Sequence, residues 1–334
     1  MNETKIILEQ IFLLIIIGVI GYCAGKFKFL PASSDKVIAS LVAKITAPLM
    51  IFTKVYNMKF GPENYINGLK VYVFAVLFNL TGYFISLFFR KRFKFEGAAS
   101  KIFSTQMMVG NVLYLAMPVI LALSTAFPES WGNAVVYAMF FVLGNDTLMW
   151  TICISLIKNG GQSAKITWKT RLKHLLNANS IAFAAGLILL FTGVRDILTS
   201  VNIINLITDR LTLIGDMTSI LSIMFIGIML SNIRISELFK DTMKKRMLLI
   251  SSSVKLLFLP LLAIFVLKLF SGFMPIEPAK IVILQLSMPA GTLAVALAAE
   301  YKSDPEYTSQ GVFLSTTIFI FTLPFILWIT EKVL

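Results

Sequence analysis

Charged side chains are scarce in this chain of 334 residues. Aspartate, glutamate, lysine and arginine make up 14% of it, whereas 57% of its residues are hydrophobic. The mean hydropathy is +0.83. Because an ordinary globular domain is about a quarter charged, this composition excludes a water-soluble domain and predicts an all-α integral membrane protein.

Histidine, cysteine and catalytic motifs are nearly absent. The single histidine, His174, excludes two-histidine metal motifs such as H-E-x-x-H. Cys23 and Cys153 both fall in apolar segments, so they do not indicate an extracellular disulfide framework. No phosphate-binding G-x-x-x-x-G-K-S/T loop and no G-x-S-x-G nucleophile elbow occurs. An enzyme is therefore disfavoured, and no cofactor or metal site is predicted beyond a coupling ion, proton or sodium.

Ten segments reach the length of about 20 apolar residues that a bilayer requires. The first has no small-residue cleavage pattern, so we interpret it as a retained helix rather than a removed signal. The predicted spans are Ile7–Phe27, Lys36–Tyr56, Leu69–Phe89, Gly97–Ser124, Trp131–Ile157, Leu175–Val194, Leu211–Ile233, Met247–Phe270, Ala279–Ala299 and Thr308–Ile329.

The basic residues give the chain a net charge of +13, but they are not gathered into one patch, so nucleic acid is not a predicted partner. Most of them lie in the loops after segments one, three, five, seven and nine. This side is expected to be cytoplasmic, which places both termini outside the cytoplasmic membrane. A single domain, 1–334, is then expected, with one five-helix repeat at 1–157, a short basic loop at 158–174 and a second, inverted repeat at 175–334.

Two similar stretches support this repeat, Ala116-Met117-Pro118-Val119 and Ser287-Met288-Pro289-Ala290. A proline inside a membrane helix removes a backbone donor and clashes with the preceding turn. Each stretch is followed by small residues, an aromatic residue and a Pro-Glu pair. We therefore expect segments four and nine to be broken, with a binding site where the broken helices meet.

Proline suits the first turn of a helix, so each second half-helix is expected to begin near Pro118 or Pro289. Its free N–H groups and dipole would attract a carboxylate or similar anion at the bilayer midplane. Asn111 and Gln285 can donate hydrogen bonds to the same ligand, and Gly291 follows the second proline. The alternative is a pair of proline kinks in which polar side chains only satisfy freed backbone groups.

Segment nine resembles the equivalent helix of the auxin efflux carrier family, which includes bacterial permeases and plant PIN carriers. The resemblance is carried by Leu284–Gly291 and by Ala299-Glu300-Tyr301. Asn111 matches the asparagine that precedes the crossover proline there. Asn177-Ala178-Asn179-Ser180 resembles the family's Asn-Pro-Asn-Thr, with alanine and serine in place of proline and threonine. This match makes Asn179 a further candidate binding residue.

The resemblance implies ten helices in two inverted repeats, crossing broken helices and an elevator-like movement of a transport domain against a scaffold, as in bile acid/sodium symporter-like folds. It also implies small organic anions as substrates, dicarboxylates such as malonate or malate in bacterial members and auxin in plant members. For this chain we expect a mono- or dicarboxylate. The loop at 158–174 is short, whereas plant carriers usually have a long loop there. This favours a bacterial-type permease.

Ionisable residues inside membrane segments are costly and mark functional sites. Asp146 is expected to bind a proton or cation for coupling, or else to be a structural aspartate bonded to hydroxyl groups. Glu300 is placed at a cavity mouth and is a second coupling candidate. Lys44 and Lys255 are expected to snorkel to the interface, with a substrate contact as the alternative for Lys44.

Two interpretations stay open at this point. The same broken helices can line a channel or the pocket of a substrate-sensing receptor instead of a carrier. The Gly21-x-x-x-Gly25 spacing allows close helix contact. It fits packing within the chain, the commoner case, or a homodimer interface.

Overall fold

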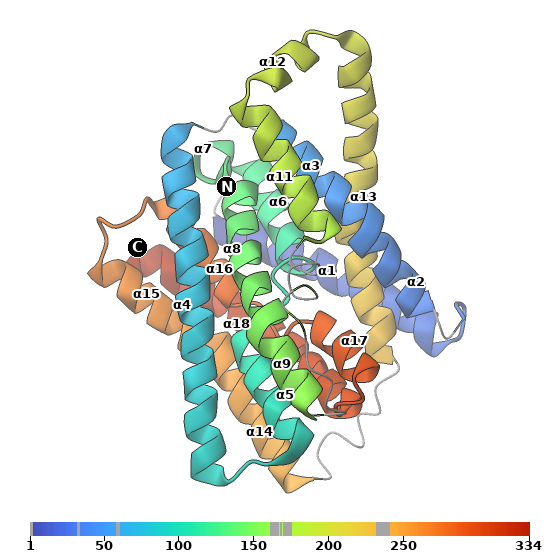
Figure 1. Cartoon of the computed structure of the whole chain (residues 1–334), viewed down its shortest axis with the longest axis vertical. Coiled ribbons are helices and arrows are strands. Elements are labelled where there is room, and N and C mark those ends of the chain that lie inside the picture. The colour runs from blue at the N-terminus through green and yellow to red at the C-terminus, as the bar shows by residue number, and fades with distance from the viewer. Residues whose placement is uncertain are drawn as a thin grey trace.

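The computed structural model describes residues 3–31, 34–57, 61–160, 167, 169, 176–231 and 241–334. In these ranges the secondary structure is helical, and the one β-type pairing is an isolated antiparallel bridge between Gly110 and Ala290 (Figure 1). Most of the loop 158–174, and the residues Leu175 and Ile233 that bound two predicted spans, lie outside the described residues.

The first half of the chain combines long and short α-helices with π-helical turns. In chain order these elements are α1 (Glu3–Lys26), α2 (Ser34–Leu41), the π-helical turn η1 (Val42–Thr46), α3 (Ala47–Tyr56), α4 (Pro62–Phe93), α5 (Gly97–Met108), α6 (Ala116–Ala126), α7 (Pro128–Trp131), α8 (Ala134–Leu148), the π-helical turn η2 (Met149–Cys153) and α9 (Ile154–Gly160).

The second half repeats this mixture of long and short helices. Its elements are α11 (Ala178–Phe191), α12 (Val194–Thr199), α13 (Asn202–Ser231), α14 (Thr242–Ser253), the π-helical turn η4 (Val254–Phe258), α15 (Leu259–Leu269), α16 (Ile276–Leu286), α17 (Leu293–Glu300) and α18 (Pro305–Val333).

Among the described residues, six helices are long and apolar enough to cross a membrane: Val37–Tyr56, Glu63–Phe93, Pro128–Gly160, Asn202–Ser231, Thr242–Leu269 and Pro305–Val333. Shorter apolar helices lie at Phe12–Lys26, Ala116–Ala126 and Ala178–Phe191. Each predicted span contains helix, so the predicted helical positions agree with the structure. The chain is therefore a multi-pass membrane protein.

Predicted segments four and nine are both interrupted. The first interruption separates α5 from α6, and the second separates α16 from α17. The prolines are not placed alike, however. Pro118 is the third residue of α6, where its missing N–H is not needed, whereas Pro289 lies within the second interruption, and α17 begins only at Leu293. Helix α6 thus begins near Pro118, as expected, whereas α17 begins four residues after Pro289.

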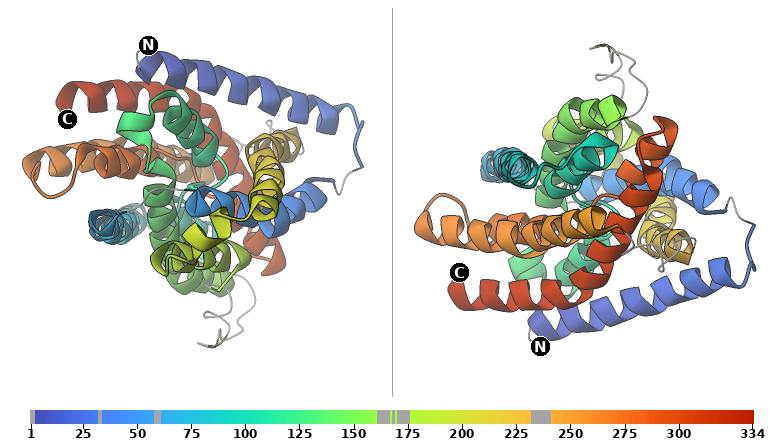
Figure 2. Two further views of the ribbon diagram at one scale, coloured as in Figure 1. Left: turned by 90° about the horizontal axis from the view of Figure 1, so that it is seen from above. Right: turned by 90° about the horizontal axis from the view of Figure 1, so that it is seen from below.

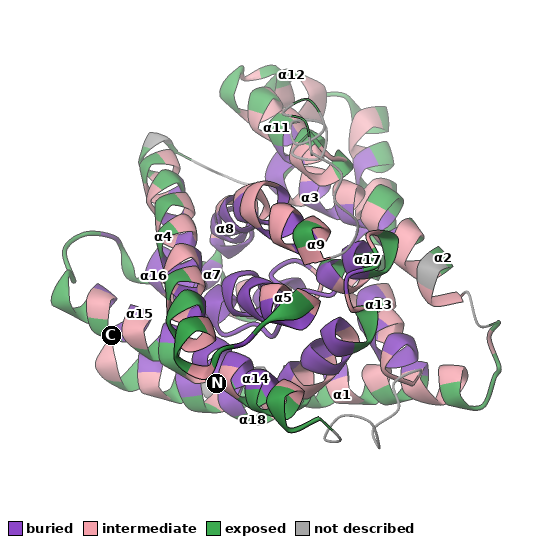
Figure 3. Cartoon of the chain, turned by 60° about the horizontal axis from the view of Figure 1, so that its bottom comes forward, coloured by how far each residue is buried: buried purple, intermediate pink, exposed green. Residues whose placement is uncertain are grey.

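The interrupted helices lie in the interior. Every residue from Ile102 to Met108 of α5 is buried, as is every residue from Ile281 to Leu286 of α16. Figure 3 shows α5, α8 and α16 surrounded by helices with many exposed apolar residues, such as α1 and α4. In a bilayer those outer faces contact lipid, so the chain segments that lack regular hydrogen bonds are kept away from hydrocarbon.

The Gly21-x-x-x-Gly25 motif packs within the chain. A Cβ atom on Gly21 would lie 2.9 Å from the Cα atom of Met224 in α13, and one on Gly227 would lie 2.8 Å from the backbone nitrogen of Tyr22 in α1. The two helix backbones are therefore in direct contact, as small residues permit. Figure 2 shows α1 crossing α13 and running beside α18.

Candidate functional site

The two interruptions meet each other through their backbones. The bridge pairs Gly110 with Ala290, and the backbone N–H of Asn111 donates to the carbonyl oxygen of Pro289 over 2.8 Å. The N–H of Gly110 donates to Oδ1 of Asn145 in α8 over 3.1 Å. Backbone groups released by the breaks thus find partners inside the protein, as membrane burial requires.

Glycine makes this close approach sterically possible. A Cβ atom on Gly110 would lie 3.4 Å from the carbonyl oxygens of both Met288 and Pro289, and one on Gly291 would lie 3.3 Å from the carbonyl oxygen of Gly110. The contact at Gly291 is tighter than most Cβ atoms make, whereas those at Gly110 are at the limit of ordinary van der Waals contact. A side chain at Gly291 would therefore require a small shift of the facing backbone.

A cavity of about 340 Å³ lies at this junction, and we call it the junction cavity. Its walls come from both interruptions, from α8 and η2, from the start of α11 and from η1. The lining residues are Ala43, Lys44, Val109, Gly110, Asn111, Val112, Leu113, Tyr114, Val142, Asn145, Asp146, Met149, Trp150, Asn177, Ala178, Asn179, Gly291, Thr292 and Leu293.

Two helix N-termini line the junction cavity. Helix α17 begins at Leu293, which lines the cavity together with Gly291 and Thr292. Helix α11 begins at Ala178, and Oδ1 of Asn177 caps it by accepting from the N–H groups of Asn179 and Ser180. Helix N-termini carry partial positive charge and favour anions.

Among the described residues, one cation and one carboxylate also line the junction cavity. Lys44, in η1, is exposed there rather than withdrawn from the site. Asp146, in α8, is half-buried and interacts with the side chains of Asn145 and Asn177. The two charges come from different helices, so the cavity can offer a positive group to a ligand while its carboxylate stays bonded to amides.

Lys255 does not snorkel. Its side chain is only 1% exposed, and its ammonium group donates to the carbonyl oxygen of Met108 over 3.2 Å and to Oδ1 of Asn79 over 3.4 Å. None of the ion pairs among the described residues involves Lys255. The expectation of snorkelling was wrong because η4 faces the interrupted helices, not lipid, and the lysine binds the carbonyl end of α5, where a cation is favourable.

The structure brings together four of the eight residues predicted for the site. Asn111, Asn179, Gly291 and Asp146 all line the junction cavity. Within the described residues, Oδ1 of Asn179 is buried and has no hydrogen-bond partner; as an acceptor it suits a donor group and not the oxygen of an anion.

The other four predicted residues do not line the junction cavity. Pro118 is buried in α6, and Pro289 contributes its carbonyl oxygen to the bond with Asn111. Gln285 is fully buried in α16, and both polar atoms of its side chain lack a partner. Glu300 is exposed at the end of α17.

Sequence reasoning missed three polar lining residues, Asn145, Asn177 and Thr292. Asn145 directly precedes Asp146, and Asn177 lies two residues before Asn179. The signal that could have found them is a polar residue beside an already suspected one inside an apolar segment. Within the described residues, no group of three or more His, Cys, Asp or Glu side chains could hold a metal ion.

Comparison with known proteins gives the family but no individual relative. No curated protein matches the chain. A family model described as membrane transport protein matches residues 6–327, nearly the whole sequence. The chain therefore belongs to this family of membrane transport proteins, the one that contains the auxin efflux carriers.

Proposed function

We propose that this protein is a secondary transporter that binds a small organic anion, a mono- or dicarboxylate, in the junction cavity. The observation that carries the proposal is that two helix N-termini and Lys44 line one cavity beside the interrupted helices. Such helix ends recognise anions without any deeply buried counter-charge in the site.

The side chains around the cavity suit a carboxylate. Asn111 and Asn179 line it with side-chain amides, whose NH2 groups could donate to an anion, and the exposed Lys44 supplies a cation. Apolar residues such as Val142 and Met149 line the remaining wall and suit a short aliphatic body. A volume of about 340 Å³ is at the small end of ligand pockets, which favours a compact metabolite over a large amphiphile.

Alternating access is the mechanism we infer for this site. Two groups of elements line the cavity, η1 with the start of α11 and the two interruptions with α8. A sliding of one group past the other, as in an elevator, would open the site to each face of the membrane in turn. Two inverted five-helix repeats, 1–157 and 175–334, would supply matching halves for this movement. The conformation of the interruptions beside the ligand would then be stabilised by Pro118, Pro289 and Gln285.

Asp146 is our proposed coupling residue. Among the described residues it is the carboxylate that lines the junction cavity, and its amide partners come from α8 (Asn145) and from the residue before α11 (Asn177). A proton or sodium ion bound there would change the charge of the site. That change would favour one position of η1 and α11 relative to the interrupted helices over the other, which couples ion binding to the movement. Glu300 lies outside the cavity and is the weaker candidate.

The short loop at 158–174 favours a bacterial-type permease. The distribution of basic residues favours a cytoplasmic membrane protein with both termini outside.

Transport current tests this proposal. Proteoliposomes on a solid-supported membrane are exposed to a panel of mono- and dicarboxylates, with and without pH and sodium gradients. A saturable current that weakens in Asn111→Ala supports the assignment. Saturable binding without current would indicate a sensor, and current that never saturates would indicate a channel. Silence across the panel, from protein that is shown to be folded, would overturn the choice of carboxylates.

A further inference from the structure

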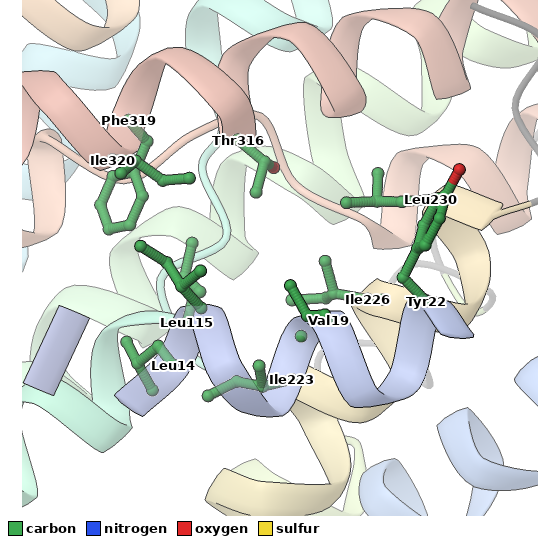
Figure 4. Close-up of a pocket in the computed structure, with 13 residues that line it drawn as sticks. Leu14, Val19, Tyr22, Leu115, Ile223, Ile226, Leu230, Thr316, Phe319 and Ile320 are labelled. Atoms are coloured by element: carbon green, nitrogen blue, oxygen red, sulfur yellow. The ribbon is translucent and has the colours of Figure 1, made fainter. Parts of the chain in front are cut away.

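A second hollow, of about 220 Å³, lies between α1, α13 and α18, and we call it the apolar groove. Of the described residues that line it, only Tyr22 and Thr316 carry a polar side-chain atom. Figure 4 shows Tyr22 at one end, with its hydroxyl group directed away from Leu14 and Leu115. The groove therefore offers apolar contact and almost no hydrogen bonding.

The groove is continuous with a surface that faces hydrocarbon. Both α13 and α18 are long and apolar enough to cross a membrane, and Phe12–Lys26 of α1 is a shorter apolar helix. Val19 lines the groove and is 53% exposed, and its neighbour Ile20 is 54% exposed on the same helix. The medium at the mouth of the groove is thus the bilayer interior.

The shape of the groove selects among apolar occupants. Its lining runs along α1 from Leu14 to Tyr22, a rise of about 12 Å at 1.5 Å per residue. Water would find almost no partners there, and an empty groove would forfeit dispersion contacts along its whole length. An extended hydrocarbon chain fits both the length and the chemistry.

We propose that the apolar groove binds one acyl chain of a phospholipid from the surrounding bilayer. The head group would stay at the membrane surface while the chain lies against Ile223 and Phe319. This is a defined site because residues of three helices line it.

The bound chain would contact the wall of the junction cavity. Leu115 lines the apolar groove, whereas its neighbours Leu113 and Tyr114 line the junction cavity. The hydroxyl group of Ser222 in α13 donates to the carbonyl oxygen of Tyr114 over 3.0 Å and ties this connection to the groove. Occupation of the groove would therefore stabilise the connection between α5 and α6. The lipid site itself does not depend on the substrate proposed above.

Photo-crosslinking of the full chain in nanodiscs tests the site. The nanodiscs contain phosphatidylcholine with a small fraction of a phosphatidylcholine that carries a diazirine in the middle of one acyl chain. After illumination, peptide mapping should place the main adducts on groove residues of α1 and α18. Adducts confined to exposed residues outside the groove, such as Phe12 and Phe321, would overturn the proposal without any variant.

A filling substitution gives a second, independent readout. A Cβ atom on Gly18 would meet only Cγ2 of Ile223, at 3.8 Å, so a side chain there enters the groove without a backbone clash. We expect Gly18→Phe to lower the groove adducts roughly tenfold, because the ring occupies the space of the chain. Ile20→Phe adds a ring on the exposed face of the same helix and should leave the groove adducts unchanged.

The folding of each variant is checked by gel filtration and thermal unfolding. If Gly18→Phe does not fold, Thr316→Phe fills the groove from the opposite wall and replaces it. Unchanged groove labelling in a folded filling variant, or an equal loss in Ile20→Phe, would contradict a defined acyl-chain site.

Discussion

The backbone N–H of Asn111 donates to the carbonyl oxygen of Pro289 over 2.8 Å, and this bond joins the two interruptions of the chain. It uses no side-chain atom. The side chain of Asn111 is left to line the junction cavity, although only 4% of the residue is exposed. Structure and ligand binding can therefore be separated at this position, since a side-chain substitution keeps the backbone bond.

Asn111→Ala should weaken substrate binding and leave folding intact. Loss of one amide hydrogen bond to a charged ligand costs about 1.5–3 kcal/mol, so the half-saturating concentration should rise roughly ten- to hundredfold. The transport current against substrate concentration measures it. Asn57→Ala, at an exposed position after α3, is the matched control and should behave as wild type. Wild-type affinity in a folded Asn111→Ala protein would place the ligand elsewhere.

The ammonium group of Lys255 gives a prediction about stability. It is buried between Met108 and Asn79 without a described carboxylate partner. Asn79→Asp places a negative charge where Oδ1 now accepts from the lysine at 3.4 Å. This completes a buried ion pair and should raise the melting temperature by several degrees.

The matched comparison is Asn79→Asp in the background of Lys255→Met. There the new carboxylate would be buried without a partner. The free energy of unfolding should therefore fall by roughly 3–5 kcal/mol relative to Lys255→Met alone, and the melting temperature should fall with it. Thermal unfolding in detergent, followed by intrinsic fluorescence, measures both pairs. If Asn79→Asp instead lowers the melting temperature of the protein that retains Lys255, the lysine is neutral in the folded state.

The positions of the breaks were predictable from the sequence because their cause is local. A proline in an apolar segment removes a backbone donor wherever the helix packs. The partners of the breaks were not predictable, because they depend on tertiary contacts. The residue that pairs with Gly110 is Ala290. Gly110 lies eight residues before Pro118, whereas Ala290 directly follows Pro289, so the two prolines lie at different places relative to the pairing although their sequence contexts are alike.

Lys255 shows the same limit for a side chain. A lysine about a third of the way into an apolar segment is what a snorkelling residue looks like in sequence. Only the packing of η4 against the end of α5 distinguishes a buried lysine from a snorkelling one. The pattern of apolar residues in the segment does not indicate this packing. Asn145 and Asn177 were missed for a related reason, since an asparagine inside a helix or before one reads as structural until its neighbours in space are known.

Asp146→Asn should remove the coupling of transport to an ion gradient. The substitution keeps the size of the side chain and its contacts with Asn145 and Asn177, but it can no longer gain or lose a proton or balance a cation. We expect any dependence of the current on pH or sodium to disappear while substrate-driven exchange persists. Asp216→Asn is the control. Asp216 does not line the cavity, its carboxylate lies 2.9 Å from the ammonium group of Lys54, and its side chain is 47% exposed. Gradient dependence that survives in Asp146→Asn would make this aspartate structural.

Gln285 gives a test of whether a buried amide serves the ligand or only fills space. Neither polar atom of its side chain has a hydrogen-bond partner among the described residues, and the residue is fully buried. Replacement of an unsatisfied buried amide by an apolar side chain of similar shape should be neutral or stabilising by about 1–3 kcal/mol. We expect Gln285→Met to melt at or above the wild-type temperature. A stable variant with weakened substrate affinity would show that the amide reaches the ligand during transport, and a destabilised one would show that it has a partner in the folded state.

The contact between α1 and α13 predicts opposite outcomes for two glycines on the same interface. A Cβ atom on Gly227 would lie 2.8 Å from the backbone nitrogen of Tyr22, so Gly227→Ala forces the helix backbones apart and should destabilise the protein by about 1–3 kcal/mol. A Cβ atom on Gly18 meets only Cγ2 of Ile223, at 3.8 Å, which is ordinary contact. Gly18→Ala should therefore be neutral or stabilising, because alanine favours the helix by up to about 1 kcal/mol. Thermal unfolding of both variants decides it, and equal melting temperatures would mean that the two helices are not in direct backbone contact.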